Sequence, residues 1–456
     1  MFQDLKNRSI FNKKEVHSSK KQLSVVLSRN FRFRANFLFY FAIELANKFD
    51  MKIEVLLAPC PELFPTMRHV EFLRPILSEL TQELKEAGIV VSAFTNLSYE
   101  DNFLKMMAYL NDMSGLVLAD YHTMPQASEK IMSLLDLNCY VAIIEALNIY
   151  PCWSISDHKE YSAATFRHKL KPHTLALEMA KVPEYSSLIQ PTKCSFNTDE
   201  IISYLTRYCD TAVLPIYCDS TKHKADQELA EFIDTKLAYY AKLKNDPLAE
   251  CTSKMSKWLA YGVLSPQIIG SAVLNSPGND LAKDMYLEEL ICRRELAENF
   301  VYYACPDHFS STNFYSWTTN TLKAHMSDER QVILSRHELE YGFSPNQLWN
   351  AIQINLLQSG EMHGYVRMYW AKTVLKWTSD PFSAAEWVLY FNNKYAIDGS
   401  TPNSSVGVLW AMRGLHDRAF GERPIFGKIR YMSETALKKH FDIQEYMMQL
   451  KDTNSV

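Results

Sequence analysis

The segments LSVVL (residues 23–27) and KIEVLL (residues 52–57) are short runs rich in branched apolar side chains, and the helical pattern NFLFYFAIELANKF (residues 36–49) lies between them. Strand–helix–strand repetition at this spacing predicts a parallel sheet wrapped by helices. The pattern continues with one more helical stretch and three more runs, at 67–87, 89–94, 115–119 and 139–144. No GxGxxG or GxxxxGK(S/T) pattern follows these strands, which argues against a dinucleotide fingerprint and a P-loop.

The remainder of the chain changes character twice. Residues 150–225 are interrupted by prolines and resemble a long connector, the prolines being Pro151, Pro172, Pro183, Pro191 and Pro215. Helical periodicity dominates beyond them, with candidate helices at 226–244, 266–274, 285–303, 346–359, 364–377 and 381–394. We therefore predict an α/β N-terminal domain with a parallel, Rossmann-like sheet (1–155), a connector (156–225) and an all-α domain (226–456).

The composition limits the class of protein. The 456 residues are 47% hydrophobic, which is ample for a large core and excludes disorder for most of the chain. Lys and Arg number 48 against 52 Asp and Glu, a net charge of −4 that at first sight argues against nucleic acid. Residues 1–34 nevertheless hold nine Lys and Arg, which indicates either a solvated tail or an arm that faces DNA or directs targeting.

Cysteine usage and hydropathy point to the inside of a cell. The nine cysteines form no CxxC pair and have no His partner at zinc-finger spacing, so we expect reduced thiols and no metal site. No apolar run is long and uninterrupted enough for a transmembrane helix, and the N-terminus lacks a signal-peptide core. We expect an intracellular protein without a membrane partner.

Seven of the eight tryptophans lie in the second half of the chain. Trp370 and Trp377 are seven residues apart and share one helix face, and Trp349 lies on the preceding predicted helix. Three such indoles either pack as core or form an electron-hopping chain from a buried redox centre to the surface. Helical spacing alone favours the core.

Two further patterns each allow a structural and a functional interpretation. Arg367 and Asp398, at the ends of successive helical segments, form either an ordinary salt bridge or a clamp on a heteroaromatic ring. The hydroxyl-rich run 252–256 precedes a predicted helix, where it either caps the helix or binds a pyrophosphate.

Two charged segments are equally open. Acidic and basic side chains alternate with apolar ones in 288–295, which indicates a solvated ladder or a carboxylic acid that faces a pocket. Basic and aromatic side chains interleave in 421–432, which is typical of a nucleic-acid surface or of a structured loop.

The order of these motifs is more specific than any one of them. MHGYVRMYWAKTVLKW (362–377), NNKYAIDG (392–399), GVLW (407–410) and ERPIFGKIRYM (422–432) resemble the signature of class II cyclobutane pyrimidine dimer (CPD) photolyases. The family's pattern also fits LWNA (348–351), RRELAENF (293–300), KNDP (244–247) and NIYPCW (148–153), so the resemblance spans nearly the whole chain.

The resemblance implies a cofactor and a substrate. FAD, active as FADH−, binds in the helical domain, and DNA presents a CPD flipped out of the duplex. The family's motif places these residues at the FAD: Tyr240, Thr252, Ser253, Lys254, Met255 and Ser256 at the phosphates, Arg367 and Asp398 beside the isoalloxazine, and Asn392 facing N5. The N-terminal domain is of the antenna type, and whether a second chromophore binds there stays open.

The same resemblance assigns the remaining site residues. Glu289, Asn245 and Trp410 contact the dimer, Lys244 and Arg430 occupy or flank the hole in the duplex, and Trp370, Trp377 and Trp349 form the photoreduction chain. Local charge agrees, because residues 236–258 carry five Lys and 421–440 five Lys and Arg, each against two acids. We expect a monomer that works wherever the DNA is, in the nucleus of a eukaryote.

The chain departs from the family's pattern at a few positions, which puts the detail of DNA contacts and of the antenna site in doubt: Lys244, Leu147, Thr373, Asn393 and Phe420. A cryptochrome-like photoreceptor without repair activity is the alternative, and a light-independent DNA-binding or scaffold protein is a third interpretation. Retention of Glu289, Asn245 and Trp410 favours the enzyme.

Overall fold

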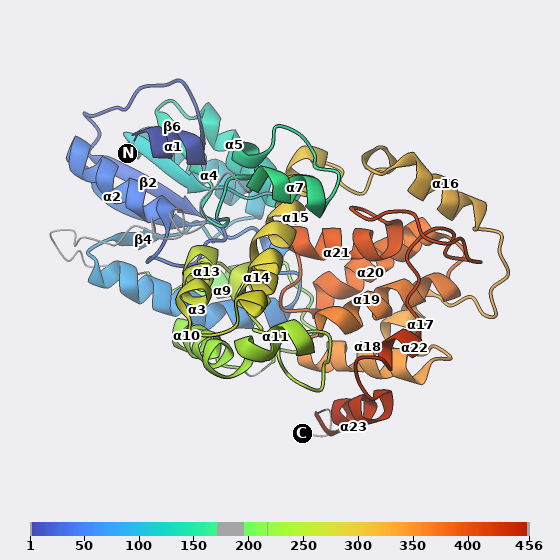
Figure 1. The fold of residues 1–456 in the computed structure, drawn as a ribbon. Coiled ribbons are helices and arrows are strands. Elements are labelled where there is room, and N and C mark those ends of the chain that lie inside the picture. The colour runs from blue at the N-terminus through green and yellow to red at the C-terminus, as the bar shows by residue number, and fades with distance from the viewer. Residues whose placement is uncertain (1, 171–195, 217, 454–456) are drawn as a thin grey trace.

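A computed structural model describes residues 2–170, 196–216 and 218–453, and it contains one six-stranded sheet beside a layer of helices (Figure 1). The strand order is β1-β6-β5-β2-β3-β4, and β1 is the antiparallel member at one edge. The strands are β1 (Ser9–Phe11), β2 (Gln22–Leu27), β3 (Lys52–Leu57), β4 (Val90–Ser92), β5 (Leu116–Asp120) and β6 (Tyr140–Ile144).

The sheet is covered on both faces, which explains its near-continuous apolar strands. Successive residues of β2 belong to different hydrophobic clusters. Val25 is buried with Leu38 and Leu73 on one face of the sheet, and Val26 is buried with Leu110 and Ile131 on the other. The covering helices are α2 (Phe37–Phe49), α3 (Met67–Glu86), α4 (Tyr99–Met113) and α5 (Pro125–Ser133), joined by the short helices η1 (Pro61–Leu63) and η2 (Leu134–Asp136). The predicted α/β domain with a parallel sheet is confirmed for β2 to β6.

The N-terminal segment differs from both interpretations offered for its basic composition. Residues Phe2–Arg8 form α1, and β1 then pairs with β6 in the register Ser9↔Ile144. Arg8 is buried, and its guanidinium donates to the carbonyls of Asn148 and Ile149. A three-residue strand is too short to show periodicity, so the composition alone misled the prediction of a tail or arm for this segment.

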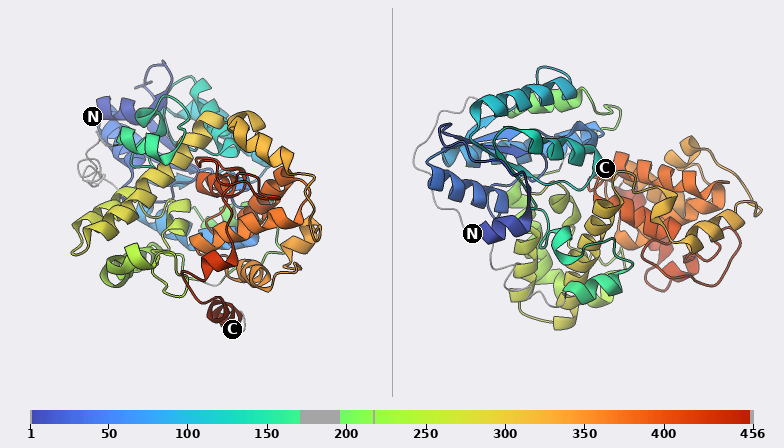
Figure 2. Two further views of the ribbon diagram at one scale, coloured as in Figure 1. Left: turned by 45° about the vertical axis from the view of Figure 1, so that its right-hand side comes forward. Right: turned by 90° about the horizontal axis from the view of Figure 1, so that it is seen from above.

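The second half of the chain is helical, as predicted (Figures 1 and 2). Its first helices, up to Ala304, share the core of the sheet, and the helices from Arg336 onward pack mainly in a second core. Between the two halves lie α6 (Cys152–Ile155), α7 (Ala163–Leu170) and α9 (Thr198–Thr206). The next helices are α10 (Lys222–Glu231), η3 (Phe232–Lys236), α11 (Leu237–Leu243), α12 (Ser256–Ala260), α13 (Pro266–Asn275), α14 (Asp280–Leu287), η4 (Glu288–Arg293), α15 (Arg294–Ala304) and η5 (Ser311–Asn313). The last are α16 (Ser316–Ala324), α17 (Arg336–Glu340), α18 (Gln347–Ser359), α19 (Gly364–Thr373), η6 (Val374–Trp377), α20 (Pro381–Tyr395), α21 (Pro402–Arg413), α22 (Glu434–Leu437) and α23 (Ile443–Thr453).

The boundaries of the predicted connector stay a prediction, since residues 171–195, which include three of its prolines, lie outside the described residues. Within the described part, α9 packs against α3 through buried Ile201 and Leu205. This helix therefore belongs to the layer that covers the sheet.

A buried polar seam joins the sheet to the helical layer. Asp120, at the carboxyl end of β5, accepts hydrogen bonds from the backbone N–H groups of Ser28, Arg29 and Asn30, at 2.8 to 2.9 Å. The Arg29 side chain, positioned in this way, donates to the carbonyl of Ala260 at the end of α12 (2.8 Å). Burial lowers the pKa of Arg29 to about 10, far enough above neutrality to keep its charge.

A second part of the seam lies on α15. The Glu295 carboxylate accepts from the backbone N–H groups of Ile149 and Tyr150, and Arg294 donates to Asn148 Oδ1 (2.7 Å) and to the carbonyl of Leu147. Burial raises the pKa of Glu295 to about 8. The NIYPCW motif is thus held by the first turn of α15.

Replacement of Asp120 by Asn tests the importance of the seam. The amide offers one acceptor oxygen and turns an NH2 group towards donors, so at least one buried N–H loses its partner. We expect the free energy of unfolding to fall by about 2–3 kcal/mol in urea denaturation. Asp112→Asn, at an exposed position of α4, is the control. Equal stability of D120N and D112N contradicts the proposed role.

Candidate active site

A cavity of about 480 Å³ opens between the 250–257 loop, the junction of α18 and α19, and α23. It collects most of the residues that the sequence placed at the FAD: Thr252, Ser253, Lys254, Met255, Ser256, Arg367 and Asp398. More than one hundred residues separate the 252–256 run from Arg367 and Asp398, and the fold brings these segments together around one cavity. We call this space the α12–α19 cavity.

Arg367 and Asp398 are paired inside this cavity. Arg367 Nη1 and Nη2 both donate to Asp398 Oδ1 at 3.1 Å, and Nη2 also reaches the carbonyl of Met362 at 3.3 Å. Arg367 Nε is buried and meets no acceptor within the described part of the chain. A buried donor without a partner is costly, so this atom favours a ligand that offers an acceptor.

The 252–256 loop is not used as a helix cap. The N-cap residue of α12 is Met255, and no side chain makes the capping hydrogen bond. The Ser253 hydroxyl accepts from the Tyr286 hydroxyl at 3.0 Å and from the backbone N–H of Met255 at 3.4 Å, and Tyr286 packs edge-on against Tyr240 with ring centroids 5.4 Å apart. Tyr240 is buried and does not line the cavity, so it supports the loop from behind.

Sequence reasoning missed His363 and α23. His363 lines the cavity, and burial lowers its pKa to about 4, so the imidazole is neutral near pH 7. Its Nδ1 accepts the backbone N–H of Tyr365, which places the ring proton on Nε2, a donor. His363 stands inside the quoted 362–377 motif, whereas Tyr446 of α23 lines the cavity without any signal in its local sequence.

The three predicted indoles are in contact, and Trp349 occupies the middle. The rings of Trp370 and Trp349 are stacked with centroids 6.5 Å apart, and Trp377 meets Trp349 at 5.3 Å and 83°. Trp370 Nε1 donates to Gln353 Oε1 (2.8 Å), and Trp349 Nε1 donates to the Trp370 carbonyl (2.9 Å). Trp349 and Trp370 are fully buried, and Trp377 is 5% exposed.

Lys244 on the loop after α11 and Glu289 on η4 form an ion pair at the surface. Lys244 Nζ lies 3.0 Å from Glu289 Oε1, and the Glu289 side chain is 47% exposed. Neighbouring Asn245 is half-buried. Glu289 lies in the π-helical turn η4, in which Leu290 and Ile291 are buried.

Trp410 lies in a separate cluster of charges. The cluster consists of Trp410 on α21, Lys372 on α19, Asp417 and Arg430, and we call it the Trp410 cluster. Lys372 Nζ lies 5.2 Å from the centre of the indole, and Arg430 Cζ lies 5.8 Å from it. Arg430 also pairs with Asp417 at 3.3 Å.

Asn392 sits in the last turn of α20 and does not line the α12–α19 cavity. It is buried, and its Nδ2 donates to Asn393 Oδ1 at 3.3 Å. Asn393 Oδ1 in turn accepts the backbone N–H of Ser400 at 3.0 Å. The two asparagines therefore fix the turn that delivers Asp398 to the cavity.

No group of His, Cys, Asp and Glu able to hold a metal ion occurs among the residues of the described ranges. Among the same residues, no helix is both long and apolar enough to cross a membrane.

Comparisons with known proteins identify the family. The chain is 32% identical over 434 residues to a deoxyribodipyrimidine photo-lyase from Potorous tridactylus, covering 92% of this chain and 79% of the relative. It is 33% identical to the photo-lyase of Methanothermobacter thermautotrophicus (90% of each chain) and 31% identical to that of Arabidopsis thaliana (94% and 88%). The chain belongs to the deoxyribodipyrimidine photo-lyase family. No family model matches it.

Solved structures support the photo-lyase fold independently. A class III photolyase from Agrobacterium tumefaciens superposes with a TM-score of 0.63 over 94% of this chain and 86% of its own, at 16% identity. A cryptochrome from Synechocystis gives a TM-score of 0.66 over 94% and 88%, at 14% identity. At such identities the likeness shows the fold, and it confirms the predicted α/β domain followed by a helical domain.

The buried ammonium of Lys372 gives the photo-lyase a pH-dependent stability. Burial lowers the folded-state pKa of Lys372 to about 7, whereas the unfolded lysine keeps a pKa near 10.4. The charged form is therefore disfavoured in the fold, and its cost is full below pH 7 and vanishes above about pH 10.

We expect Lys372→Met to raise the free energy of unfolding most at pH 6 and to lose this advantage by about pH 10. Urea titrations of wild type and variant at several pH values measure the difference. Lys376→Met, which removes a half-buried ammonium on η6, is the control. A difference between wild type and K372M that does not change with pH contradicts the assignment.

Proposed function

We propose that the protein is a light-driven photo-lyase of class II that repairs cyclobutane pyrimidine dimers in UV-damaged DNA. The observation that carries the proposal is the composition of α19. Arg367 pairs with Asp398 in the cavity, Trp370 stacks on Trp349, which meets Trp377 edge-on, and Lys372 reaches the Trp410 ring. One helix, α19, therefore carries a residue proposed to hold the cofactor, a residue proposed to supply electrons, and a lysine that contacts the residue proposed to face the lesion.

The α12–α19 cavity fits FAD. Hydroxyls of Thr252, Ser253 and Ser256 and the ammonium of Lys254 suit the pyrophosphate, and Arg367 and Asp398 suit a heteroaromatic ring with acceptors and donors. The buried Arg367 Nε is ready for an acceptor atom. Residues of this cavity would hold FAD, which in its reduced form FADH− would supply under light the electron that opens the cyclobutane ring. Asn392 stays assigned by the family's motif to the neighbourhood of N5.

Surface residues near the cavity suit a flipped lesion. Glu289 is exposed and offers a carboxylate to the imide edge of a pyrimidine, while Lys244 holds it by an ion pair in the free protein. Asn245 adds an amide, and Trp410 offers a π-face on which the dimer packs. Lys244 and Arg430 bring positive charge to the gap left in the duplex.

The indole contacts support one order of electron transfer. Trp370 would give one electron to the oxidised flavin, Trp349 would give one to Trp370 and Trp377 one to Trp349, and an added thiol would return the electron to Trp377. This order follows from the ring contacts, since Trp349 touches both other rings. Carbonyl oxygens on the N–H groups of Trp370 and Trp349 stabilise the positive charge as it passes.

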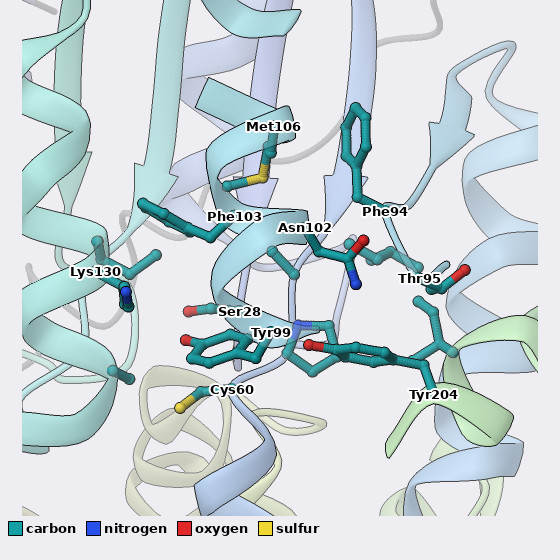
Figure 3. Close-up of a pocket in the computed structure, with 16 residues that line it drawn as sticks. Ser28, Cys60, Phe94, Thr95, Tyr99, Asn102, Phe103, Met106, Lys130 and Tyr204 are labelled. Carbon is teal, nitrogen blue, oxygen red and sulfur yellow. The ribbon is translucent and has the colours of Figure 1, made fainter. Parts of the chain in front are cut away.

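An antenna chromophore does not fit the cavity at the carboxyl ends of β2 and β3. Figure 3 shows Tyr99, Phe103 and Tyr204 crowded around this space, with Ser28 and Cys60 nearby. The free volume is about 30 Å³, room for about two water molecules. We therefore propose no second chromophore for this cavity and derive no step through one.

We further propose that the protein works as a monomer inside the cell, in the nucleus of a eukaryote, with UV-damaged DNA as its partner. A cryptochrome-like photoreceptor without repair activity has the same fold, but it has no use for Glu289, Asn245 and Trp410 at the lesion. The repair activity is therefore the better match to the residues.

Repair is tested by illuminating the purified, reduced protein with an oligonucleotide that carries a CPD. We expect a flavin spectrum in the protein and loss of the dimer under light of about 350–450 nm, the range in which flavins absorb. A dark sample and a sample with oxidised flavin are controls. A flavin-containing protein that leaves the dimer intact supports the photoreceptor, and a protein without flavin refutes both.

Photoreduction without DNA tests the indole chain. We expect Trp370→Phe to abolish light-driven reduction of the oxidised protein by a thiol, because the proposed electron path to the flavin begins at Trp370. Repair by the chemically reduced variant should persist. Trp387→Phe, a half-buried indole on α20 outside the chain, should photoreduce normally. Normal photoreduction in W370F contradicts the assigned path.

A further inference from the structure

Trp410 is flanked by two cations, and the indoles of the chain are not. Lys372 Nζ and Arg430 Cζ lie 5.2 Å and 5.8 Å from the centre of the Trp410 ring, within the range of a cation–π contact. In the described residues, no Lys or Arg lies over the rings of Trp349, Trp370 or Trp377.

Two indoles of the chain have electronegative oxygen atoms as polar neighbours, whereas Trp410 has positively charged groups. Trp370 and Trp349 direct their N–H groups at oxygen acceptors, Gln353 Oε1 and the Trp370 carbonyl. The ammonium of Lys372 is buried, donates to the carbonyl of Ala411 at 2.6 Å, and stands two residues after Trp370 on α19. One helix therefore carries an electron donor and a cation that faces another indole.

Removal of an electron from an indole turns this contact from attraction into repulsion. A neutral ring attracts a cation through its quadrupole, whereas an oxidised ring carries a positive charge and is repelled by it. Oxygen acceptors on the N–H have the opposite effect, because they bind the oxidised ring more tightly.

We propose that Lys372 and Arg430 protect Trp410 from light-driven oxidation, so that electrons drawn into the cofactor cavity come from Trp370 and the lesion-facing indole stays intact. The inference rests on the proposed function, since the oxidant is the light-excited, oxidised flavin. In the suppressed reaction one electron leaves the Trp410 ring for this oxidant, and the ring becomes a radical cation. Lys372 and Arg430 act through Trp410 and are positioning residues.

Asp417 moderates the positive field of the cluster and fixes it in place. Its carboxylate lies 3.3 Å from Arg430 Nε and faces Lys372, whose pKa it raises against the larger effect of burial. Neighbouring His416 is buried, and burial lowers its pKa to about 3, so it adds no charge near pH 7. At pH 6, below the pKa of Lys372, two cations and one carboxylate leave the ring of Trp410 beside a net positive charge, so the illumination is done at this pH.

The test uses the flavin-containing protein with the main path cut by Trp370→Phe. We expect W370F alone to show no photoreduction, and W370F combined with Lys372→Met and Arg430→Gln to regain a measurable rate, because the two cation–π contacts that hold back oxidation of Trp410 are gone. Addition of Trp410→Phe should remove the regained rate. Arg430→Lys keeps the charge and should restore the suppression, which a merely structural role does not predict.

A second readout does not depend on photoreduction. After long illumination without thiol, peptide mass spectrometry should find oxidised Trp410 in R430Q and K372M and not in wild type. R430Q is safe for folding because the Arg430 side chain is 47% exposed. Lys376→Met, which removes a cation from the ring of Tyr431, is the matched control and should leave Trp410 unoxidised.

The outcomes separate the two proposals. Wild-type protein that contains no flavin refutes the proposed function. Wild-type protein that photoreduces, with a W370F/K372M/R430Q variant that contains flavin and stays as inactive as W370F, overturns the protection of Trp410 alone. Oxidation of Trp410 in illuminated wild type also overturns it.

Discussion

The carboxylate of Asp120 is the constraint on which the arrangement of the two halves depends. It gathers three successive N–H groups at the end of β2, and this fixes the backbone from which Arg29 and Arg32 leave the sheet. Arg29 holds the carbonyl of Ala260, and Arg32 holds that of Gly262 at 2.9 Å. Both carbonyls lie at the end of α12, whose first residue belongs to the cavity wall. The sheet therefore positions the loop that lines the α12–α19 cavity without lining the cavity itself.

The helix α19 then distributes the chemistry. Because successive residues of a helix point 100° apart, Arg367, Trp370 and Lys372 face different neighbours. Arg367 meets Asp398, Trp370 enters the core between α18 and α20, and Lys372 crosses to α21. The same backbone thus holds Lys372, which faces Trp410, and Trp370, which contacts Trp349, at a fixed spacing.

The two interpretations of the tryptophans do not exclude each other. Trp349 and Trp370 are core residues by burial, and their dense packing is also what places the rings in contact. The same holds for Arg367 and Asp398, which are a salt bridge and the wall of a cavity at once. By contrast, the capping interpretation of 252–256 is wrong, because the Ser253 hydroxyl accepts from Tyr286 and the N-cap is Met255. A local sequence pattern shows only which interpretation is more frequent in proteins. Which one applies depends on a contact with a residue distant in the chain, such as that between Ser253 and Tyr286.

The sequence by itself determined the parallel sheet β2 to β6, the helices that carry long apolar stripes, and, through the 362–377 and 392–399 motifs, the family. These features depend on periodicity or on runs of residues that are close along the chain. Tertiary structure alone decided that Phe2–Phe11 closes the sheet edge, that Trp349 stands between Trp370 and Trp377, and that Tyr446 covers the cavity. It also decided that Lys372 faces Trp410. Each of these contacts joins residues far apart in the chain, and the packing that selects them is a property of the whole fold, which no local window of sequence records.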